Sequence, residues 1–347
     1  MDAHQAVTGI NSENVTAWML EHEPTAVAPF SFELIAGGHS NMTFRMTDEN
    51  GKSWALRRPP LKQVLATAHD MLREYKIISA LADSDVPVPK AVGLCEDTDI
   101  NERPFYVMEF MPGTILRTTE IAETFPVEIR AKMARTLVTV MARIHAVDVD
   151  AVGLGDLGKK EDYIARQLRR WMRQYDESKV EDRVEMREIH DHLAARIPDQ
   201  GTAGIVHGDY RLDNCMMSDS GEVAAVLDWE LCTLGDVRAD VSQLLGYWAR
   251  PGDQQGGALR ESPTLADGFP EKDEVLELYE AESGRSMANI DYYLCFSAWR
   301  LASIIEGVYS RYVGGAMGDK DPGAVEEFVV QRDDLIARAL HHAALIS

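Results

Sequence analysis

The stretch HGDYRLDN, residues 207–214, lies between two apolar runs, GTAGIV at 201–206 and VAAVLDW at 223–229. It carries a histidine, three charged side chains and an asparagine in one short polar segment. Asp209 and Asn214 are five positions apart, and both offer the hard oxygen ligands that Mg²⁺ prefers. Asp and Asn also serve as turn residues, but a turn alone does not need this set of side chains. The segment therefore indicates chemistry.

A third oxygen ligand follows at the end of the second apolar run. Asp228 lies fourteen residues after Asn214 and directly follows the apolar part of VAAVLDW. Phosphoryl transfer needs one residue that orients the attacking hydroxyl and others that hold the metal. Asp209, Asn214 and Asp228 together therefore predict a site for Mg²⁺ and phosphate.

The loop has the spacing of a kinase catalytic loop, His-x-Asp with Asn five residues after the Asp, and the segment 228–230 stands where kinases place a metal-binding Asp. With HGDYRLDN, VLDWELCTLGD, LRRPP, REY and FYVMEFMPG, the chain resembles the aminoglycoside phosphotransferase-like family, of the APH and choline kinase type. It is most similar to the branch related to the kinase-like domain of acyl-CoA dehydrogenase fusions. The resemblance runs from about Phe32 to about Tyr312.

That resemblance implies a role for each of the three oxygen ligands. Asp209 is implied as the catalytic base of the catalytic loop 207–214. Asn214 and Asp228 are implied as Mg²⁺ ligands, with ATP and Mg²⁺ as the cofactors. The chemistry of Asp209 agrees with this, because a carboxylate can accept a proton as a hydroxyl attacks.

Four further polar residues are candidates for supporting roles at this site. We expect His207 to hydrogen-bond the loop rather than to transfer protons, and Asp240 to brace the loop. Arg211 is a candidate for contact with a phosphate or an anionic substrate, with a surface salt bridge as the equal alternative. Glu230 is a candidate for an outer or second-metal group.

The N-terminal part of the chain is expected to bind the nucleotide. GGHSN at 37–41 lies between two predicted strands, where its N–H groups can cover phosphates, although it lacks the full G-x-G-x-x-G and would alone indicate a hairpin turn. VMEFMPG at 107–113 is implied as the hinge whose backbone meets adenine. The candidate nucleotide-binding residues are Gly37, Gly38, His39, Ser40, Asn41, Arg57, Glu74, Glu109 and Met111.

The expected phosphate-binding cation is Arg57. WALR at 54–57 is in register with the V-A-I-K strand of kinases, so an arginine stands where lysine is usual. Arginine still binds phosphate, through two parallel hydrogen bonds. Arg58 is expected on the opposite face of the strand, because strand side chains alternate. Glu74, on the next helix, is expected to pair with Arg57, with a solvated helix face as the alternative.

The order of predicted elements indicates an α+β chain with a bilobal, protein-kinase-like fold. Residues 1–112 read as a short helix, an antiparallel sheet with an Asn-Gly hairpin at 50–51, and one main helix, with the hinge near 107–113. Residues 113–347 read as a larger, mainly helical lobe that contains the catalytic loop and the 228–230 segment. The Gly-rich stretch 252–268 is a candidate lid, or a plain surface loop.

The composition of the chain argues against several classes of partner and indicates a compartment. Its 347 residues carry a formal net charge of −22, which argues against a nucleic-acid or anionic-membrane partner. Four cysteines without a C-x-x-C pair indicate buried thiols in a reducing compartment. The N-terminal residues do not resemble a signal peptide, and no apolar run is long enough to span a membrane. We therefore expect a cytoplasmic protein; the sequence gives no signal for its oligomeric state.

The function that these patterns favour is an ATP- and Mg²⁺-dependent small-molecule kinase that phosphorylates a hydroxyl. The resemblance suggests a hydroxyacyl-CoA or related hydroxy compound as acceptor, and an aminoglycoside-type antibiotic as the alternative. A pseudokinase with a non-catalytic role is a further alternative, supported only by Arg57 in place of lysine. A protein kinase is disfavoured, because GDVRAD at 235–240 follows Asp228 too closely to leave room for an activation loop.

Overall fold

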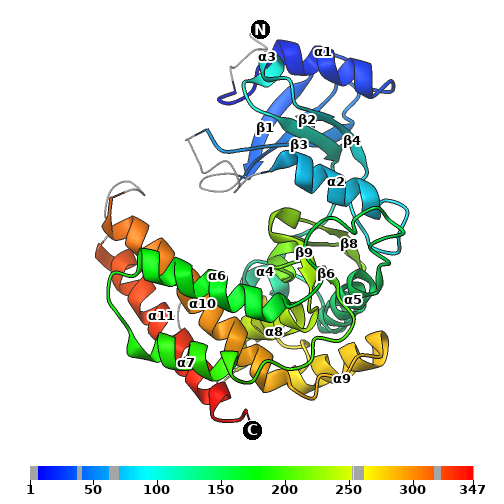
Figure 1. The fold of residues 1–347 in the computed structure, drawn as a ribbon. Helices are drawn as coiled ribbons and strands as arrows, with labels where there is room; N and C mark the ends of the chain where they lie inside the picture. Colours follow the sequence, from blue (N-terminus) through cyan, green and yellow to red (C-terminus); the bar gives the residue numbers. More distant parts are fainter. Residues whose placement is uncertain are drawn as a thin grey trace. The chain divides into compact units, whose positions relative to one another are not determined.

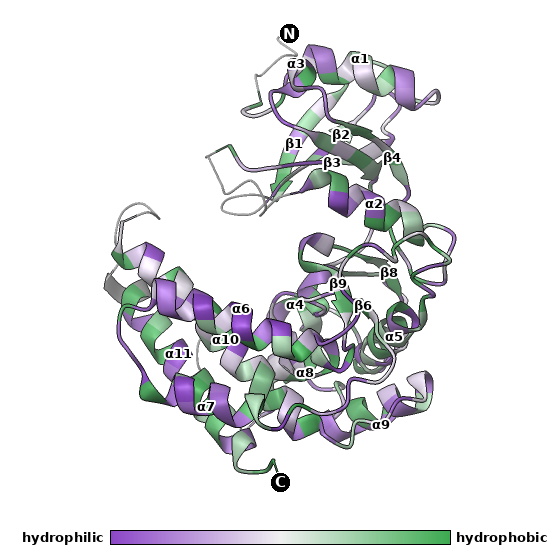
Figure 2. Ribbon diagram, in the orientation of Figure 1, coloured by the Kyte–Doolittle hydropathy of each residue, from purple (hydrophilic) through white to green (hydrophobic). Residues whose placement is uncertain are grey.

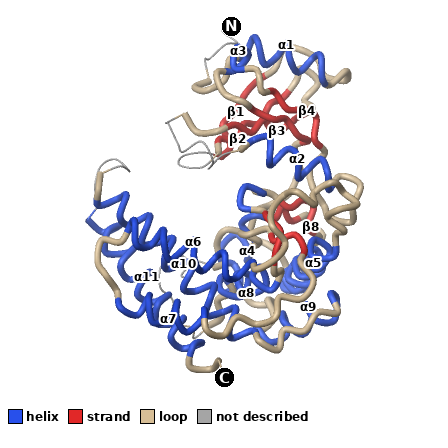
Figure 3. Tube along the Cα trace, in the orientation of Figure 1, coloured by secondary structure: helices blue, strands red, loops and turns tan. Residues whose placement is uncertain are grey.

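The computed structural model describes residues 7–36, 41–61, 70–251, 253, 262–315 and 322–346. The chain divides into two compact units. The first unit comprises Met1–Gly113 and Ala224–Glu230, and the second comprises Thr114–Val223 and Leu231–Ser347. The short segment Ala224–Glu230, which we expected with the helical lobe, therefore lies with the first unit. The predicted α+β class is confirmed (Figure 3).

The first unit is built on a five-stranded antiparallel sheet of order β1-β2-β3-β5-β4 (Figure 1). Its strands are β1 (Ser31–Ala36), β2 (Met42–Thr47), β3 (Ser53–Arg58), β4 (Ala91–Cys95) and β5 (Phe105–Glu109). Its helices are α1 (Ser12–His22), α2 (Met71–Leu81) and the short α3 (Thr98–Asn101).

The Asn-Gly hairpin forms where the sequence predicts it. Gly51 has a φ of +81°, the left-handed conformation that Gly adopts without steric cost. The Asp48 N–H donates to the Lys52 carbonyl oxygen at 2.9 Å, and the Lys52 N–H donates to the Asp48 carboxylate at 2.8 Å. This turn fixes the register of β2 on β3 and so places Arg57 opposite Thr43.

Helix α2 is amphipathic and begins at an Asp70 cap, whose carboxylate accepts from the Arg73 N–H at 3.0 Å. Its buried residues recur at helical spacing: Met71, Glu74, Ile77, Ile78 and Leu81. Glu74 is thus a carboxylate on the apolar face of the helix. A solvated helix face, the alternative for Glu74, is excluded, since the residue is only 1% exposed.

The second unit is mainly helical. Its α-helices are α4 (Thr119–Glu123), α5 (Val127–Ala146), α6 (Tyr163–Ser178), α7 (Val184–Ala194), α8 (Arg238–Tyr247), α9 (Lys272–Ser283), α10 (Ile290–Val313) and α11 (Pro322–Ala343). Strands β6 (Gly204–Val206) and β9 (Thr233–Gly235) pair antiparallel. Strand β7 (Cys215–Met217) and the one-turn 3₁₀ helices at Leu212–Asn214 and Pro263–Leu265 also belong to the second unit. Most of β8 (Val223–Val226) and of the one-turn 3₁₀ helix at Trp229–Leu231 belongs to the segment Ala224–Glu230 of the first unit.

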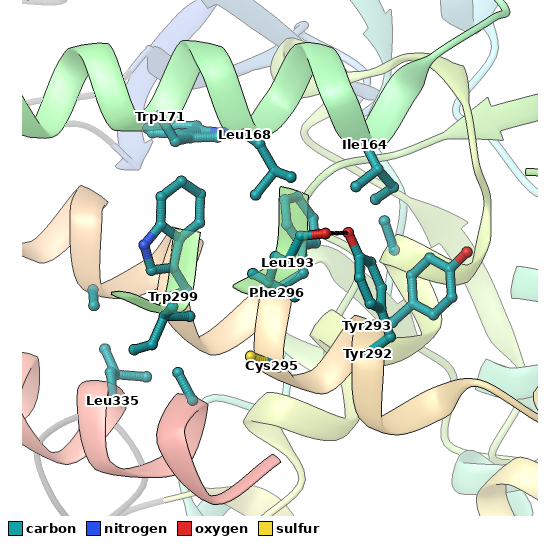
Figure 4. Packing of buried hydrophobic residues seen from close by; sticks show 14 of the residues in the cluster. Ile164, Leu168, Trp171, Leu193, Tyr292, Tyr293, Cys295, Phe296, Trp299 and Leu335 are labelled. Carbon is teal, nitrogen blue, oxygen red and sulfur yellow. Dashed lines mark hydrogen bonds between the residues drawn. The ribbon is translucent and has the colours of Figure 1, made fainter. Parts of the chain in front are cut away.

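The core of the second unit lies among α6, α7, α10 and α11. Trp171 and Leu168 of α6 point toward Trp299 and Phe296 of α10, and Leu335 of α11 packs in the same cluster (Figure 4). Helix α6 alternates hydrophilic and hydrophobic residues along its length, as an amphipathic helix does (Figure 2). These buried aromatics fix the helices that carry the residues around the catalytic loop.

Two expectations fall partly or wholly outside the described residues. The glycine-rich residues 37–40 lie outside the described part of the chain, as do 252 and 254–261 of the candidate lid. The four cysteines, all described, are buried and form no disulfide with one another, in agreement with the predicted buried thiols. No helix in the described part of the chain combines the length and apolarity needed to cross a membrane.

Candidate active site

In the first unit, Arg57 bridges two carboxylates that come from distant parts of the sequence. Its Nε lies 2.8 Å from Glu74 Oε2 on α2, and its NH2 lies 2.6 Å from Asp228 Oδ1. Asp228 follows β8 with a φ of +63°, a conformation that Asp adopts more readily than most residues. Arg58, the next residue on β3, instead donates to the Gly9 carbonyl oxygen. The alternation of strand side chains thus separates the two arginines.

In addition to its ion pair with Arg57, Glu74 accepts hydrogen bonds from two side chains. Asn41 Nδ2 donates at 2.7 Å and the Tyr106 hydroxyl donates at 3.0 Å. Burial raises the pKa of the Glu74 carboxyl, and Arg57 and the Tyr106 hydroxyl counter part of that rise. Burial would lower the pKa of Arg57, but Glu74, Tyr106 and Asp228 outweigh it and raise that pKa. The guanidinium is therefore a fixed positive charge.

Replacing Arg57 with lysine tests this bridge. An ammonium cannot reach both carboxylates as the guanidinium fork does, so Arg57→Lys gives up one charge-assisted contact. We expect the free energy of unfolding, measured by urea titration, to fall by about 1.5–3 kcal/mol. Arg103→Lys, at an exposed arginine of the same unit, is the control and should change little. Equal stability of the two variants would contradict the bridge.

The bridge lies beside a cluster of acidic groups. Glu74, Asp228 and Glu230 each place one carboxylate oxygen within 4.8 Å of the others. Asn41 Nδ2 also contacts Glu230 Oε2 at 3.4 Å, while the buried Asn41 Oδ1 has no hydrogen-bond donor among the described residues. The three carboxylates carry more negative charge than the single Arg57 guanidinium can neutralise, and Asn41 Oδ1 is a further hard oxygen. This donor set fits a divalent cation such as Mg²⁺.

Two further nucleotide-binding candidates in the described part of the chain, Glu109 and Met111, are not drawn into this cluster. Glu109 is the exposed last residue of β5, and Met111 lies two residues beyond it. The backbone N–H of Glu109 donates to the Lys90 carbonyl oxygen at 2.8 Å. Asn41, Arg57 and Glu74 are thus the described nucleotide candidates that the fold brings together, with Asp228 and Glu230.

In the second unit, Asp240 holds the start of the catalytic loop. Its carboxylate accepts from the backbone N–H groups of His207 at 2.6 Å and Gly208 at 2.9 Å, and lies 3.4 Å from His145 Nε2. Burial would raise the pKa of Asp240, but the hydrogen bond and charge of His145 and the charge of His207 lower it. Gly208 has a φ of +84°, and a Cβ there would lie 2.8 Å from the Leu231 carbonyl oxygen. The loop conformation therefore needs both this glycine and this carboxylate.

Removing the charge of Asp240 should destabilise the loop. Asp240→Asn leaves one oxygen for two N–H donors and turns an amide N–H toward one of them. We expect a loss of about 1–3 kcal/mol in the free energy of unfolding, measured by chemical denaturation. Asp191→Asn, at a carboxylate that is 82% exposed, is the matched control. A variant as stable as that control would show that the two N–H groups do not depend on the charge.

The Asp209 carboxylate is held at both oxygens. Gln243 Nε2 donates to Oδ1 at 2.9 Å, and Asn214 Nδ2 donates to Oδ2 at 2.8 Å. Asn214 Nδ2 also donates to the Asp209 carbonyl oxygen at 2.8 Å. His207 is fully buried, and its Nδ1 accepts from the Asp209 N–H at 3.3 Å. This geometry gives His207 a hydrogen-bonding place in the loop.

Arg211 lies half-buried on the same loop. Its NH1 is 3.0 Å from Asp213 Oδ2, its Nε is 3.6 Å from Asp209 Oδ2, and its guanidinium covers the Tyr247 ring at 4.6 Å. Arg211 therefore takes part in local ion pairs, the alternative that the sequence left open. Its side chain nonetheless stays beside the Asp209 carboxylate.

Asp209 lies on the wall of a cavity within the second unit. The cavity has a volume of about 320 Å³. Its wall is largely aliphatic, formed by residues of α8, α10 and α11 that include Leu245, Leu301, Ile304 and Leu335. The polar and charged residues that line the cavity include Asp209, Gln243, Lys272, Arg300, Arg338 and His342. A carboxylate at the wall of an apolar cavity is suited to receive a proton from a bound small molecule.

Sequence reasoning did not place Gln243 or Arg300 at this site. Gln243 lies three residues after Asp240, a spacing that puts both on one face of α8. That spacing is a signal that could have found it. Arg300 lies among aromatic residues of α10 whose pattern indicates core packing, and it is indeed buried at 8% exposure. Only the folded structure shows that it contacts the catalytic loop.

Residues 31–278 match the model of a protein family described as "Phosphotransferase enzyme family". Among curated proteins, the chain is 36% identical to mouse acyl-CoA dehydrogenase family member 10 over 80% of this chain and 26% of that protein. It is 33% identical to probable acyl-CoA dehydrogenase IBR3 of Arabidopsis thaliana, over 98% of this chain and 43% of that protein. The chain thus spans less than half the length of these relatives.

Solved structures of phosphotransferases are similar to this chain over nearly its full length and theirs. A Ralstonia eutropha protein, provisionally described as an aminoglycoside phosphotransferase, has a TM-score of 0.83 and 34% identity over 97% of this chain and 99% of its own. The GDP complex of aminoglycoside 2'-phosphotransferase-IIIa has a TM-score of 0.64 and 16% identity, over 94% of this chain and 99% of its own. The second match shows similarity of fold.

Proposed function

Because this chain belongs to the phosphotransferase enzyme family, we propose that it transfers the γ-phosphoryl group of Mg²⁺-ATP to a hydroxyl of a small molecule. One structural observation supports this proposal in addition to the family membership. The Asp209 carboxylate is fixed at both oxygens and lies on the wall of a cavity able to hold a small molecule. A cytoplasmic location stays a prediction.

Asp209 would act as the base. Each of its oxygens accepts one hydrogen bond and keeps a further lone pair, so the acceptor hydroxyl can still donate to the carboxylate. Asp209 orients that hydroxyl and takes its proton as the hydroxyl oxygen bonds to the γ-phosphorus and the bond from that phosphorus to the bridging oxygen of ATP breaks, so that ADP leaves. It need not be a strong base, because the transition state of phosphoryl transfer is loose.

Asn214 and Asp228 would hold Mg²⁺, each through a side-chain oxygen, and Glu230 would lie outside them. When bound, the metal neutralises the charge that develops on the phosphates. The surplus of carboxylates around Arg57 and the unpaired Asn41 Oδ1 support this assignment. Arg57 would bind phosphate oxygens while Glu74 holds it in place.

The other nucleotide contacts follow from the resemblance to kinases. Backbone N–H groups of residues 37–41 would cover the phosphates, and the backbone of Glu109 and Met111 would meet the base. His207 and Asp240 would keep the catalytic loop in its conformation, as their hydrogen bonds to the loop backbone support. Arg211 would act near the acceptor or the phosphates.

For the acceptor, we favour a hydroxyacyl-CoA or related hydroxy compound over an aminoglycoside. The aliphatic wall of the cavity suits an acyl chain, whereas a polycationic sugar would bring charges that this wall cannot pair. The similarity to proteins of the acyl-CoA dehydrogenase family points the same way. A pseudokinase with a non-catalytic role is the second candidate.

A panel of acceptors tests the proposal. The protein is incubated with Mg²⁺-ATP and hydroxyacyl-CoA thioesters, free hydroxy acids, aminoglycosides, choline or sugars, and products are identified by mass spectrometry. We expect a phosphate ester with a hydroxyacyl compound, formed at least about 100-fold more slowly with Asp209→Asn. A phosphorylated aminoglycoside would show that the acceptor is an aminoglycoside and not a hydroxyacyl compound. Nucleotide binding without any product would favour the pseudokinase.

A further inference from the structure

A run of hydrogen bonds links the Asp209 carboxylate to a buried guanidinium. Gln243 Nε2 donates to Asp209 Oδ1 at 2.9 Å, and Arg300 NH1 donates to Gln243 Oε1 at 2.9 Å. Gln243 lies on α8 and Arg300 on α10, while Asp209 lies in the catalytic loop. Three segments far apart in sequence thus meet at one carboxylate.

The amide of Gln243 has only one orientation that satisfies both partners. Its oxygen faces a guanidinium N–H, and its nitrogen faces a carboxylate oxygen. A flipped amide would place oxygen against oxygen and N–H against N–H. The amide therefore connects Arg300 to the Asp209 carboxylate, so that the position of the guanidinium constrains the orientation of the carboxylate.

Arg300 is itself firmly placed. Its NH2 donates to the Gly208 carbonyl oxygen at 3.0 Å, and its guanidinium lies 5.6 Å from the centre of the Trp171 ring. It is 8% exposed, and among the described residues no carboxylate forms an ion pair with it. Its buried Nε has no hydrogen-bond partner in that part of the chain. A buried charge without a direct counter-ion is costly unless neighbouring groups compensate it.

We propose that Gln243 and Arg300 are positioning residues that hold the Asp209 carboxylate in the orientation needed for phosphoryl transfer. Arg300 fixes the backbone before Asp209 through Gly208 and fixes the side chain of Asp209 through Gln243. The anion that compensates the buried guanidinium is Asp209, reached through the amide. The inference rests on the proposed function for its kinetic consequences, but the placement of the carboxylate can be observed independently.

Gln243→Met is the sharpest variant, because methionine keeps the length of glutamine and removes both hydrogen bonds. Turnover is measured with Mg²⁺-ATP and each panel acceptor, and with water as acceptor. We expect kcat to fall about 10- to 100-fold, the scale of a misplacement of about 1 Å. The KM for ATP and the affinity for Mg²⁺-ADP should not change. Arg300→Lys keeps the positive charge but not the planar guanidinium. Its kcat should fall less than that of Gln243→Met.

Ser242→Ala is the matched control. Ser242 is the neighbour of Gln243 on α8, is fully buried, and donates only to the Ala239 carbonyl oxygen. We expect intact kcat in this variant. In an Asp209→Asn background, Gln243→Met should cause no further loss, since Gln243 acts through Asp209. A further loss there, or an equal loss in Ser242→Ala, would mean that Gln243 only supports the fold.

Crystal structures of the intact protein and of Gln243→Met separate this inference from the proposed function. If the intact protein turns over no ATP, the proposed function fails, and the structures alone decide the positioning role. We expect the Asp209 carboxylate to rotate or become disordered in the variant. A carboxylate that keeps its orientation without Gln243 would overturn the inference.

Discussion

Asp209→Asn should lower kcat for phosphoryl transfer by about 10²–10⁴-fold, the usual contribution of a general base. Asparagine has the shape of aspartate, and its side-chain oxygen still accepts from Gln243 Nε2. It has no charge and cannot take the proton of the acceptor hydroxyl. The loss should therefore appear in kcat, while the affinity for Mg²⁺-ADP, measured by calorimetry, stays the same.

Asp213→Asn is the control for this result. Asp213 lies on the same loop and pairs with Arg211 at 3.0 Å, but it does not receive the hydrogen bond from Gln243. Its side chain is 28% exposed, close to the 26% of Asp209. We expect this variant to keep most of the activity. Equal losses in the two variants would show that any carboxylate on the loop matters and that Asp209 is not the base.

Asp228→Asn should raise the Mg²⁺ concentration needed for half-maximal activity and lower kcat/KM by about 10³-fold, the scale of a lost charge-stabilising contact. The amide oxygen still accepts from Arg57, and Arg57 keeps its contact with Glu74. The fold should therefore survive while the metal is held by a weaker ligand. A titration of Mg²⁺ at fixed ATP gives the measurement.

Asp219→Asn, at an exposed carboxylate, serves as the control for Asp228→Asn. It should leave the Mg²⁺ dependence unchanged. Because Asp228 also neutralises Arg57, the free energy of unfolding of both variants must be compared before the kinetics are interpreted. An unchanged Mg²⁺ dependence in a stable Asp228→Asn protein would remove Asp228 from the metal site.

The sequence predicts those parts of the site that are local. The spacing in HGDYRLDN is local, so Asp209 and Asn214 could be named, and the structure joins them at 2.8 Å. The alternation along β3 is local too, and it separates Arg57 from Arg58. Whether these residues perform the implied chemistry stays a prediction, which the variants above test.

Other parts of the site depend on tertiary contacts that no local pattern carries. Arg300 lies among core aromatics of α10, and its contact with Gly208 joins residues 92 positions apart. Asn41 reaches Glu230 across 189 positions. Burial of Glu74 could not be read from α2 alone, since a glutamate at that position is equally compatible with a solvated face. Pairing with Arg57 explains why a carboxylate lies on the apolar face.

The transfer of label from [γ-³²P]ATP to a metabolite extract tests the central claim most directly. The intact protein is incubated with the extract and Mg²⁺, in parallel with Asp209→Asn and with intact protein in the presence of EDTA. We predict that label enters a phosphate ester with the intact protein, enters it at least about 100-fold more slowly with Asp209→Asn, and does not enter it with EDTA. Label that stays in ATP and inorganic phosphate in all three reactions, although the protein binds the nucleotide, would contradict phosphoryl transfer to a small-molecule hydroxyl.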